Sequence, residues 1–308
     1  MRTILSFSLA VVAALALAGC SADDEADPDT VSVSATTTQV ADLTRNVAGD
    51  RAVVNGILTA TSDPHDYEPR PSDVEALADA DLLLSSGGEV DLWFEDLVES
   101  SGSDAPHVDL LGRVQTTADD PHWWQDPRAA IAAVEAIRDE LVAVDPEGSA
   151  EYEANARGYI KELRILDREV AACIERIPAA ERELVTSHDA LGPFADRYGI
   201  EVIGAAIPAI TTQAQPSAGA TAELVELIRA RGVTTIFPEA GVSGELEAAI
   251  ASEAGAGVGA ELWADALGPE GSGGETYIDA IQSNATAMVE GFSDGAETCS
   301  FSQGEARG

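Results

Sequence analysis

The chain has 308 residues, of which 17 are Lys or Arg and 55 are Asp or Glu, so its formal net charge is −38. A protein surface with this excess of negative charge repels polyanions, which disfavours nucleic acids and anionic membrane faces as partners. The same charge favours the binding of cations. We therefore expect no nucleic-acid partner. The length is sufficient for two domains of about 100–200 residues each.

The first twenty residues have the features of a lipoprotein signal peptide. Arg2 supplies the positive charge, residues 4–16 are apolar, and Leu17-Ala18-Gly19-Cys20 resembles a lipobox, whose Cys is acylated and becomes the new N-terminus. The apolar run is shorter than the about 20 residues of a membrane-spanning helix. We expect residues 21–30 to be an acidic tether and the body to be extracytoplasmic, lipid-anchored at Cys20 to the outer face of the cell membrane. An uncleaved anchor is the alternative.

Two cysteines, Cys173 and Cys299, remain after Cys20. In an oxidising compartment they predict one disulfide between the end of a long helix and the C-terminal tail. Two unpaired buried thiols are the alternative. A thiolate metal site would need more cysteines at close spacing.

Before residue 145, short β-rich runs alternate with helical patterns. The expected strands are 31–35, 52–58, 81–85 and 107–111, and the expected helices are 39–47, 72–80, 90–98 and 128–144. Ser72 followed by Glu75 predicts a capping box at the start of the second helix. The alternation predicts an N-terminal lobe, 31–144, with a mostly parallel sheet covered by helices on both faces.

Residues 145–177 predict one long helix. A single apolar stripe runs along it through Tyr152, Tyr159, Leu163, Leu166, Val170, Cys173 and Ile177. Some thirty residues of helix span roughly 45 Å, long enough to join two lobes rigidly.

The alternation resumes in residues 178–308. Strands are expected at 183–187, 200–205, 233–237 and 257–263, and helices at 190–198, 217–231, 244–254 and 275–292. The predicted fold class is therefore α/β with two lobes, each a mostly parallel sheet flanked by helices, joined by one long rigid helix.

Three of the four histidines lie in polar loop motifs. His65 belongs to Asp-Pro-His-Asp-Tyr-Glu-Pro, His122 to Asp-Pro-His-Trp-Trp-Gln-Asp-Pro and His188 to Thr-Ser-His-Asp-Ala-Leu-Gly, while Asp265 lies in Ala-Asp-Ala-Leu-Gly. Imidazole and carboxylate are the ligands that a divalent transition metal takes when thiolates are absent, and three His with one Asp complete a tetrahedral shell. His65, His188 and Asp265 each follow an expected strand, and His122 precedes a helix. Two ligands per lobe place the predicted metal site between the lobes.

Other residues have less certain roles near this predicted site. Glu239, after an expected strand, is a candidate hydrogen-bond partner for a ligand imidazole, with a solvated loop carboxylate as the alternative. Glu261 lies near Asp265 in sequence and competes with it as the ligand. Trp123 and Trp124 adjoin His122 and either shield the metal from water or fill the core between the lobes.

These motifs, together with Gln215-Pro-Ser, resemble the zinc and manganese solute-binding proteins of ABC importers, from about residue 31 to residue 292 and in family order. The resemblance implies a metal held by His65, His122, His188 and Asp265 and delivered to an ABC permease with its ATPase. It also implies a monomer without enzymatic activity. The chain departs from the family pattern at Asp265, where Asp-Pro-Leu is more usual. It also lacks the His-rich loop that many zinc-specific members carry.

Three imidazoles and one carboxylate suit Zn, whereas Mn prefers more oxygen donors; in the resembled family a Glu at the third position accompanies Mn. His188 therefore favours zinc, with manganese or iron as alternatives. A surface lipoprotein or adhesin whose metal only holds the lobes together is another hypothesis. A zinc hydrolase would need an open coordination position and a general base, whereas a fourth ligand at Asp265 closes the shell.

Overall fold

The computed structural model describes residues 30–60, 62–114 and 120–302. The predicted signal peptide, Cys20 and nearly all of the predicted tether lie outside these residues. Within the described ranges, no helix combines the length and the apolar character needed to cross a bilayer.

The first sheet has four parallel strands in the order β2-β1-β3-β4. These strands are β1 (Val31–Ala35), β2 (Ala52–Gly56), β3 (Leu82–Ser85) and β4 (His107–Asp109), and the accompanying helices are α1 (Thr38–Ala48), α2 (Pro71–Ala78), α3 (Trp93–Ser101) and α4 (Pro127–Val144). All four residues of β3 are buried, as expected for a central parallel strand whose two faces are both covered. We call these elements the first lobe.

The second lobe repeats this arrangement with shorter strands. It contains β5 (Glu183–Thr186), β6 (Glu201–Ala205), β7 (Thr235–Ile236) and β8 (Gly257–Val258), with α6 (Gly192–Tyr198), α7 (Ala218–Arg231), α8 (Glu245–Ala254) and α9 (Tyr277–Phe292). β5 pairs with β6 and β7 with β8, all parallel, and a single bridge from Thr186 to Phe237 connects the two pairs. The expected strand 257–263 is broken, because the chain leaves the ladder after Val258 and rejoins it only at Leu262, opposite Glu239.

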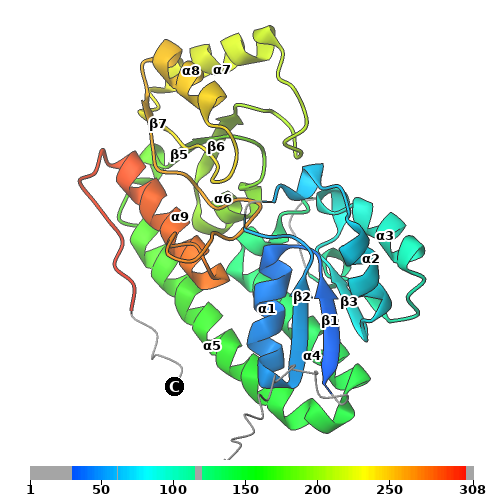
Figure 1. Cartoon of the computed structure of the whole chain (residues 1–308). Coiled ribbons are helices and arrows are strands. Elements are labelled where there is room, and N and C mark those ends of the chain that lie inside the picture. The colour runs from blue at the N-terminus through cyan, green and yellow to red at the C-terminus, as the bar shows by residue number, and fades with distance from the viewer. Residues whose placement is uncertain (1–29, 61, 115–119, 303–308) are drawn as a thin grey trace, which may run out of the picture. The chain divides into compact units, whose positions relative to one another are not determined.

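Helix α5 (Ser149–Ile174) joins the lobes. It packs against α1 and α4 of the first lobe and against α6 and α9 of the second, as the green ribbon in Figure 1 shows. It is shorter than expected because Pro146–Gly148 form a separate 3₁₀ turn, in which the Asp145 carboxylate accepts a hydrogen bond from the Gly148 amide. The fold class predicted from the sequence, two α/β lobes joined by one long helix, is confirmed.

One large hydrophobic cluster runs from the first sheet along α5 into the second lobe. It contains Val33 and Leu84 of the first sheet, Leu163 of α5 and Phe194 of α6. Two smaller clusters lie on the outer faces of the two sheets. The continuous core gives the junction between the lobes a packed interior, on which the loops at the strand ends are supported.

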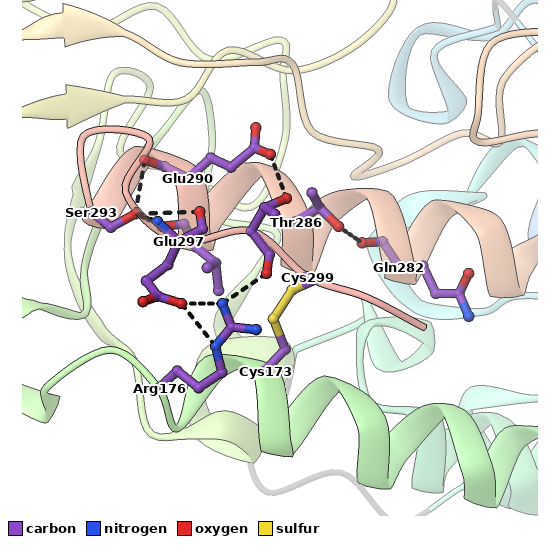
Figure 2. Close-up of a disulfide and its surroundings, with 10 residues drawn as sticks. Cys173, Arg176, Gln282, Thr286, Glu290, Ser293, Glu297 and Cys299 are labelled. Atoms are coloured by element: carbon purple, nitrogen blue, oxygen red, sulfur yellow. Dashed lines mark hydrogen bonds and ion pairs between the residues drawn. A yellow bond between two sulfur atoms is a disulfide. The ribbon is translucent and has the colours of Figure 1, made fainter. Parts of the chain in front are cut away.

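A disulfide joins Cys173, near the end of α5, to Cys299 in the C-terminal tail, as predicted (Figure 2). Around it, Arg176 forms an ion pair with Glu297 and donates a second hydrogen bond to the Thr298 carbonyl at 2.8 Å. The Thr298 hydroxyl in turn donates to Glu290 of α9 at 2.7 Å. The tail is therefore attached to both α5 and α9.

Candidate metal centre

Four residues from separate loops converge at one point: His65, His122, His188 and Asp265. His65 lies in the 3₁₀ turn Pro64–Asp66 between β2 and α2, and His122 immediately precedes another 3₁₀ turn before α4. His188 follows β5, and Asp265 follows the bridge at Leu262. Each residue offers one ligand atom, and these atoms all lie within 4.8 Å of one another.

These four side chains are buried with their polar atoms facing each other. The exposed fractions of the side chains are 1% for His65, 0% for His122, 1% for His188 and 4% for Asp265. The Asp265 carboxylate lies 3.3, 3.4 and 3.1 Å from the Nε2 atoms of His65, His122 and His188. Donor atoms bound to one zinc at about 2.0–2.1 Å lie roughly 3.4 Å apart in a tetrahedron. The spacing therefore suits a metal ion at the centre.

None of the three Nε2 atoms and neither Asp265 oxygen has a hydrogen-bond partner of good geometry within the described chain. Buried polar atoms are rarely left unpaired, since each unpaired group costs about 1–3 kcal/mol. Five such atoms facing one point are the signature of a site that a ligand completes.

In each imidazole, Nε2 faces the centre of the cluster and Nδ1 lies close to an oxygen atom that orients the ring. Nδ1 of His65 lies 3.3 Å from the Glu89 carbonyl, and Nδ1 of His122 lies 2.8 Å from Asp120 Oδ1. Nδ1 of His188 lies 2.7 Å from Glu239 Oε2. A proton on Nδ1 leaves the Nε2 lone pair directed inward, as metal coordination requires.

Asp120, absent from the predicted site, could have been found from a repeat in the sequence. Both Asp-Pro-His motifs use their Asp in the same way: the Asp63 carboxylate accepts a hydrogen bond from the His65 amide at 2.9 Å, and Asp120 accepts one from His122, also at 2.9 Å. This local bond fixes the turn that presents the imidazole. The repetition of Asp two residues before His was the available signal.

The two tryptophans are buried core residues, and Trp124 also holds the Asp265 loop. Trp124 Nε1 and Gln125 Nε2 each donate to the Ala264 carbonyl at 2.8 Å, one residue before Asp265. Trp123 donates to the Ser86 carbonyl at 3.0 Å at the end of the first sheet. The loop that carries His122 therefore links the first sheet to the Asp265 loop of the second lobe.

The electrostatics of the cluster are dominated by burial and by the pairing of imidazoles with carboxylates. Burial lowers the pKa of His188, but the carboxylates of Asp265 and Glu239 outweigh it and raise that pKa to about 11. The pKa of His65 is also raised, because Asp265 outweighs burial. Burial opposes ionisation of Asp265, but His188 and His122 hold its pKa far below the usual range. Burial and the charge of Asp265 raise the pKa of Glu239.

Glu261, the competing ligand considered from the sequence, and His107, the fourth histidine, both lie outside the cluster. Glu261 is exposed, whereas Asp265 is in the cluster. His107 contacts Ser85 through a 2.9 Å hydrogen bond and Phe94 through an edge-on ring contact, outside the four-residue cluster.

The chain is similar in sequence and in structure to several known metal-binding proteins. The Manganese-binding lipoprotein MntA of Halalkalibacterium halodurans is 31% identical over 95% of this chain and 99% of its own. The Iron-binding protein YfeA of Yersinia pestis is 30% identical over 94% of each chain. The periplasmic zinc binding protein TroA from Treponema pallidum superimposes with a TM-score of 0.80 at 27% identity, over 85% of this chain and 99% of its own.

The sequence profile of one family, described as zinc-uptake complex component A, periplasmic, matches residues 33–291. That range includes all four converging residues and both lobes, so the match extends over the whole site rather than one half of it. The chain therefore belongs to this family.

Proposed function

We propose that the protein is the extracytoplasmic solute-binding lipoprotein of an ABC importer. It captures a divalent transition metal, zinc, between its lobes through His65, His122, His188 and Asp265 and delivers it to a membrane permease driven by an ATPase. The observation that carries the proposal is the convergence of four buried ligand atoms, two residues from each lobe, with inward-facing atoms that lack partners. Family membership supports the transport role.

Zinc is favoured by the chemistry of the donors. Three imidazoles and one carboxylate suit Zn, whereas Mn prefers more oxygen ligands. One observation favours manganese as the second candidate. Asp265 turns Oδ2 toward His65 and His188 and Oδ1 toward His122, so both oxygens face the centre. The carboxylate therefore offers two oxygen donors, the kind of ligand that Mn prefers. The relatives are named for manganese, iron and zinc, which supports a competition test between metals.

The family is one of solute-binding transport components, so the chain is not an enzyme. Four protein ligands also leave no position for the water that a hydrolytic zinc site must keep open. The adhesin alternative differs in one respect: its metal would stay bound, whereas a transport component must release its metal to a permease. Neighbouring reading frames that encode an ATPase and a permease would support transport.

The proposed location depends on Cys20 and on the relatives. MntA and several manganese-transport relatives carry the word lipoprotein in their names. We therefore infer acylation of Cys20, a monomeric body outside the cell membrane and an anchor in its outer face. Metabolic labelling with a fatty acid, lost in a Cys20→Ala variant, tests the anchor.

The metal assignment is tested by purifying the processed protein without added metal, measuring the bound elements, and then competing Zn against Mn. We expect about one equivalent of zinc per chain, retained in excess Mn. A His107→Gln variant is the matched control, because His107 lies outside the cluster. Retention of manganese in preference to zinc, or two or more tight sites, would contradict the assignment.

A further inference from the structure

The segment between β6 and α7, residues 207–216, lies beside the loop that carries His65. Together with Leu246 of α8 they line an open pocket of about 550 Å³. The first lobe contributes Asp63 and Asp66, and the segment contributes Ile207 and the run from Thr212 to Pro216. This segment crosses from the second lobe toward the first metal loop.

Its N-terminal half is bonded to the residues on either side of His188. The Ile207 amide donates to the Ser187 carbonyl at 2.7 Å, and the Asp189 amide donates to the Ala209 carbonyl at 3.0 Å. The position of the segment is therefore tied to the loop that presents the third imidazole.

Its other half is bonded to the first metal loop through Asp63. One oxygen of this carboxylate, Oδ1, accepts the local hydrogen bond from the His65 amide at 2.9 Å. The other oxygen, Oδ2, accepts a hydrogen bond from the Thr212 hydroxyl at 2.7 Å, across 149 residues of sequence. The same carboxylate thus fixes the turn of His65 and receives a donor from the second lobe.

We propose that Thr212 is a positioning residue that sets the rate of metal release. Through Asp63 it holds the His65 loop against the β6–α7 segment, which itself holds the His188 loop, so one connected path joins a ligand of each lobe. Hydrogen bonds to charged acceptors are stronger than neutral ones. Loss of the Thr212 donor leaves the local bond from the His65 amide to Asp63 intact, so the ligand set survives while the His65 loop moves away from the β6–α7 segment more readily. The inference rests on the proposed function.

The test uses the processed, zinc-loaded protein and measures the rate at which a chelator in excess removes zinc. Thr212→Val keeps the shape of the side chain but removes the donor, and we expect release to accelerate on the order of tenfold, a factor that corresponds to about 1.4 kcal/mol. Thr212→Ser retains the hydroxyl and should restore the wild-type rate. Thr211→Val is the matched control, because Thr211 only accepts a hydrogen bond from the Gln213 amide within the same segment.

Two further readouts separate positioning from damage to the fold or the site. The metal-free Thr212→Val protein should still unfold in one cooperative transition, with its melting temperature lowered by no more than the loss of one hydrogen bond, and the visible spectrum of its Co²⁺ complex should be unchanged, because the four ligands are kept. Release from Thr212→Val at the wild-type rate, or equal acceleration by Thr211→Val, would overturn the inference while leaving the metal site in place. A wild-type protein that binds no metal would instead overturn the proposed function, and this inference with it.

Discussion

At the scale of single residues, the Nδ1 atoms of the three imidazoles lie near three different oxygen atoms. His65 faces a backbone carbonyl at 3.3 Å, whereas His122 and His188 face carboxylates at 2.8 and 2.7 Å. A carboxylate at Nδ1 raises the basicity of the opposite nitrogen and fixes the ring more firmly than a carbonyl does. His65 is therefore the least constrained of the three, and it is also the one whose loop the Thr212 bond supports.

Removal of a ligand imidazole should abolish tight binding. We expect His65→Ala, His122→Ala and His188→Ala each to lower zinc affinity by about two or more orders of magnitude while the α/β circular dichroism is retained, because each loses one of four proposed bonds. Asp265→Ala should lose less if a water molecule replaces the carboxylate. Competition with a fluorescent chelator measures the effect. Wild-type affinity in any histidine variant would remove that residue from the proposed ligand set.

Zinc binding should release protons at neutral pH. Asp265 and Glu239 raise the pKa of His188 above the ordinary imidazole value, so we expect the metal-free protein to hold a proton there that zinc must displace, since a ligand imidazole is neutral. Affinity should therefore fall steadily as pH decreases from 8 to 6, rather than only below the ordinary His pKa of about 6.5. Calorimetry in buffers of different ionisation enthalpy counts the protons. Binding that is independent of buffer and pH would contradict this account.

The four converging residues could be named from their loop motifs, and Glu239, which lies 2.7 Å from His188 Nδ1, could be named as a candidate partner of a ligand imidazole. Asp120 was recoverable, since it repeats the role of Asp63 in an identical Asp-Pro-His triplet. Gln125 was not, because its bond to the Ala264 carbonyl joins residues 139 positions apart in sequence. Such contacts depend on how the lobes pack, which no local pattern specifies.

At the scale of elements, hydrophobic periodicity predicted the order and type of the helices and strands, and local polar chemistry moved their ends. The predicted capping box from Ser72 to Glu75 was wrong: α2 begins at Pro71, and Asp73 accepts a 2.7 Å hydrogen bond from the Arg70 amide. Proline at the first helical position explains the earlier start, because it lacks the amide that would otherwise be unpaired. Strands β7 and β8 are shorter than expected, and Phe237 and Leu262 pair only as isolated bridges beyond them.

One contact between helices makes a contribution to folding stability that depends on pH. Asp42 on α1 accepts hydrogen bonds from the Tyr277 amide at the start of α9 and, at 3.4 Å, from Tyr159 of α5. Burial raises its pKa from 3.8 to about 6. Because the pKa of Asp42 is higher in the folded chain than in the unfolded chain, the protonated carboxyl stabilises the fold. This stabilisation is fully present below pH 3.8 and is lost as pH rises through about 6.

Asp42→Asn should remove this dependence. An amide can still accept from the Tyr277 amide but carries no buried charge, so at pH 7 the variant should be more stable than the wild type by on the order of 1 kcal/mol, with a smaller difference at pH 4.5. Denaturant unfolding of the metal-free protein at the two pH values measures this. Asp50→Asn, at an exposed position just beyond α1, is the control. A variant that is equally destabilised at both pH values would contradict the assignment.

At the scale of the whole molecule, the large core cluster is continuous through α5, and the four proposed ligands come from both lobes. The boundaries that we predict for the lobes, 31–144 and 178–308 with the helix segment 145–177 between them, remain a prediction. With such a core, we expect the scattering profiles of the metal-free and zinc-bound forms to be nearly the same, because release needs loop movement more than a wide opening.

Zinc should also stabilise the folded chain by mass action. An ion that binds only the folded arrangement adds about 4 kcal/mol at a free concentration of 1,000 times Kd, so the melting temperature should rise with free zinc. Scanning calorimetry over a series of buffered zinc concentrations measures the rise, and His188→Ala should abolish it. A melting temperature that is independent of zinc in the wild type would contradict a site formed by both lobes.

The disulfide between Cys173 and Cys299 gives the chain a closed covalent ring, whose ends are 126 positions apart in sequence. By restricting the unfolded chain, a ring of this size raises the free energy of unfolding by about 5 kcal/mol. His188 and Asp265 lie inside the ring, and His65 and His122 lie on the open arm that precedes it. A single peptide-bond cleavage within the ring therefore leaves one molecule that still carries all four residues. If the cleavage precedes Asp265, such a nicked protein would migrate near full length on a non-reducing gel until a reductant separated it into two fragments, each holding part of the proposed site.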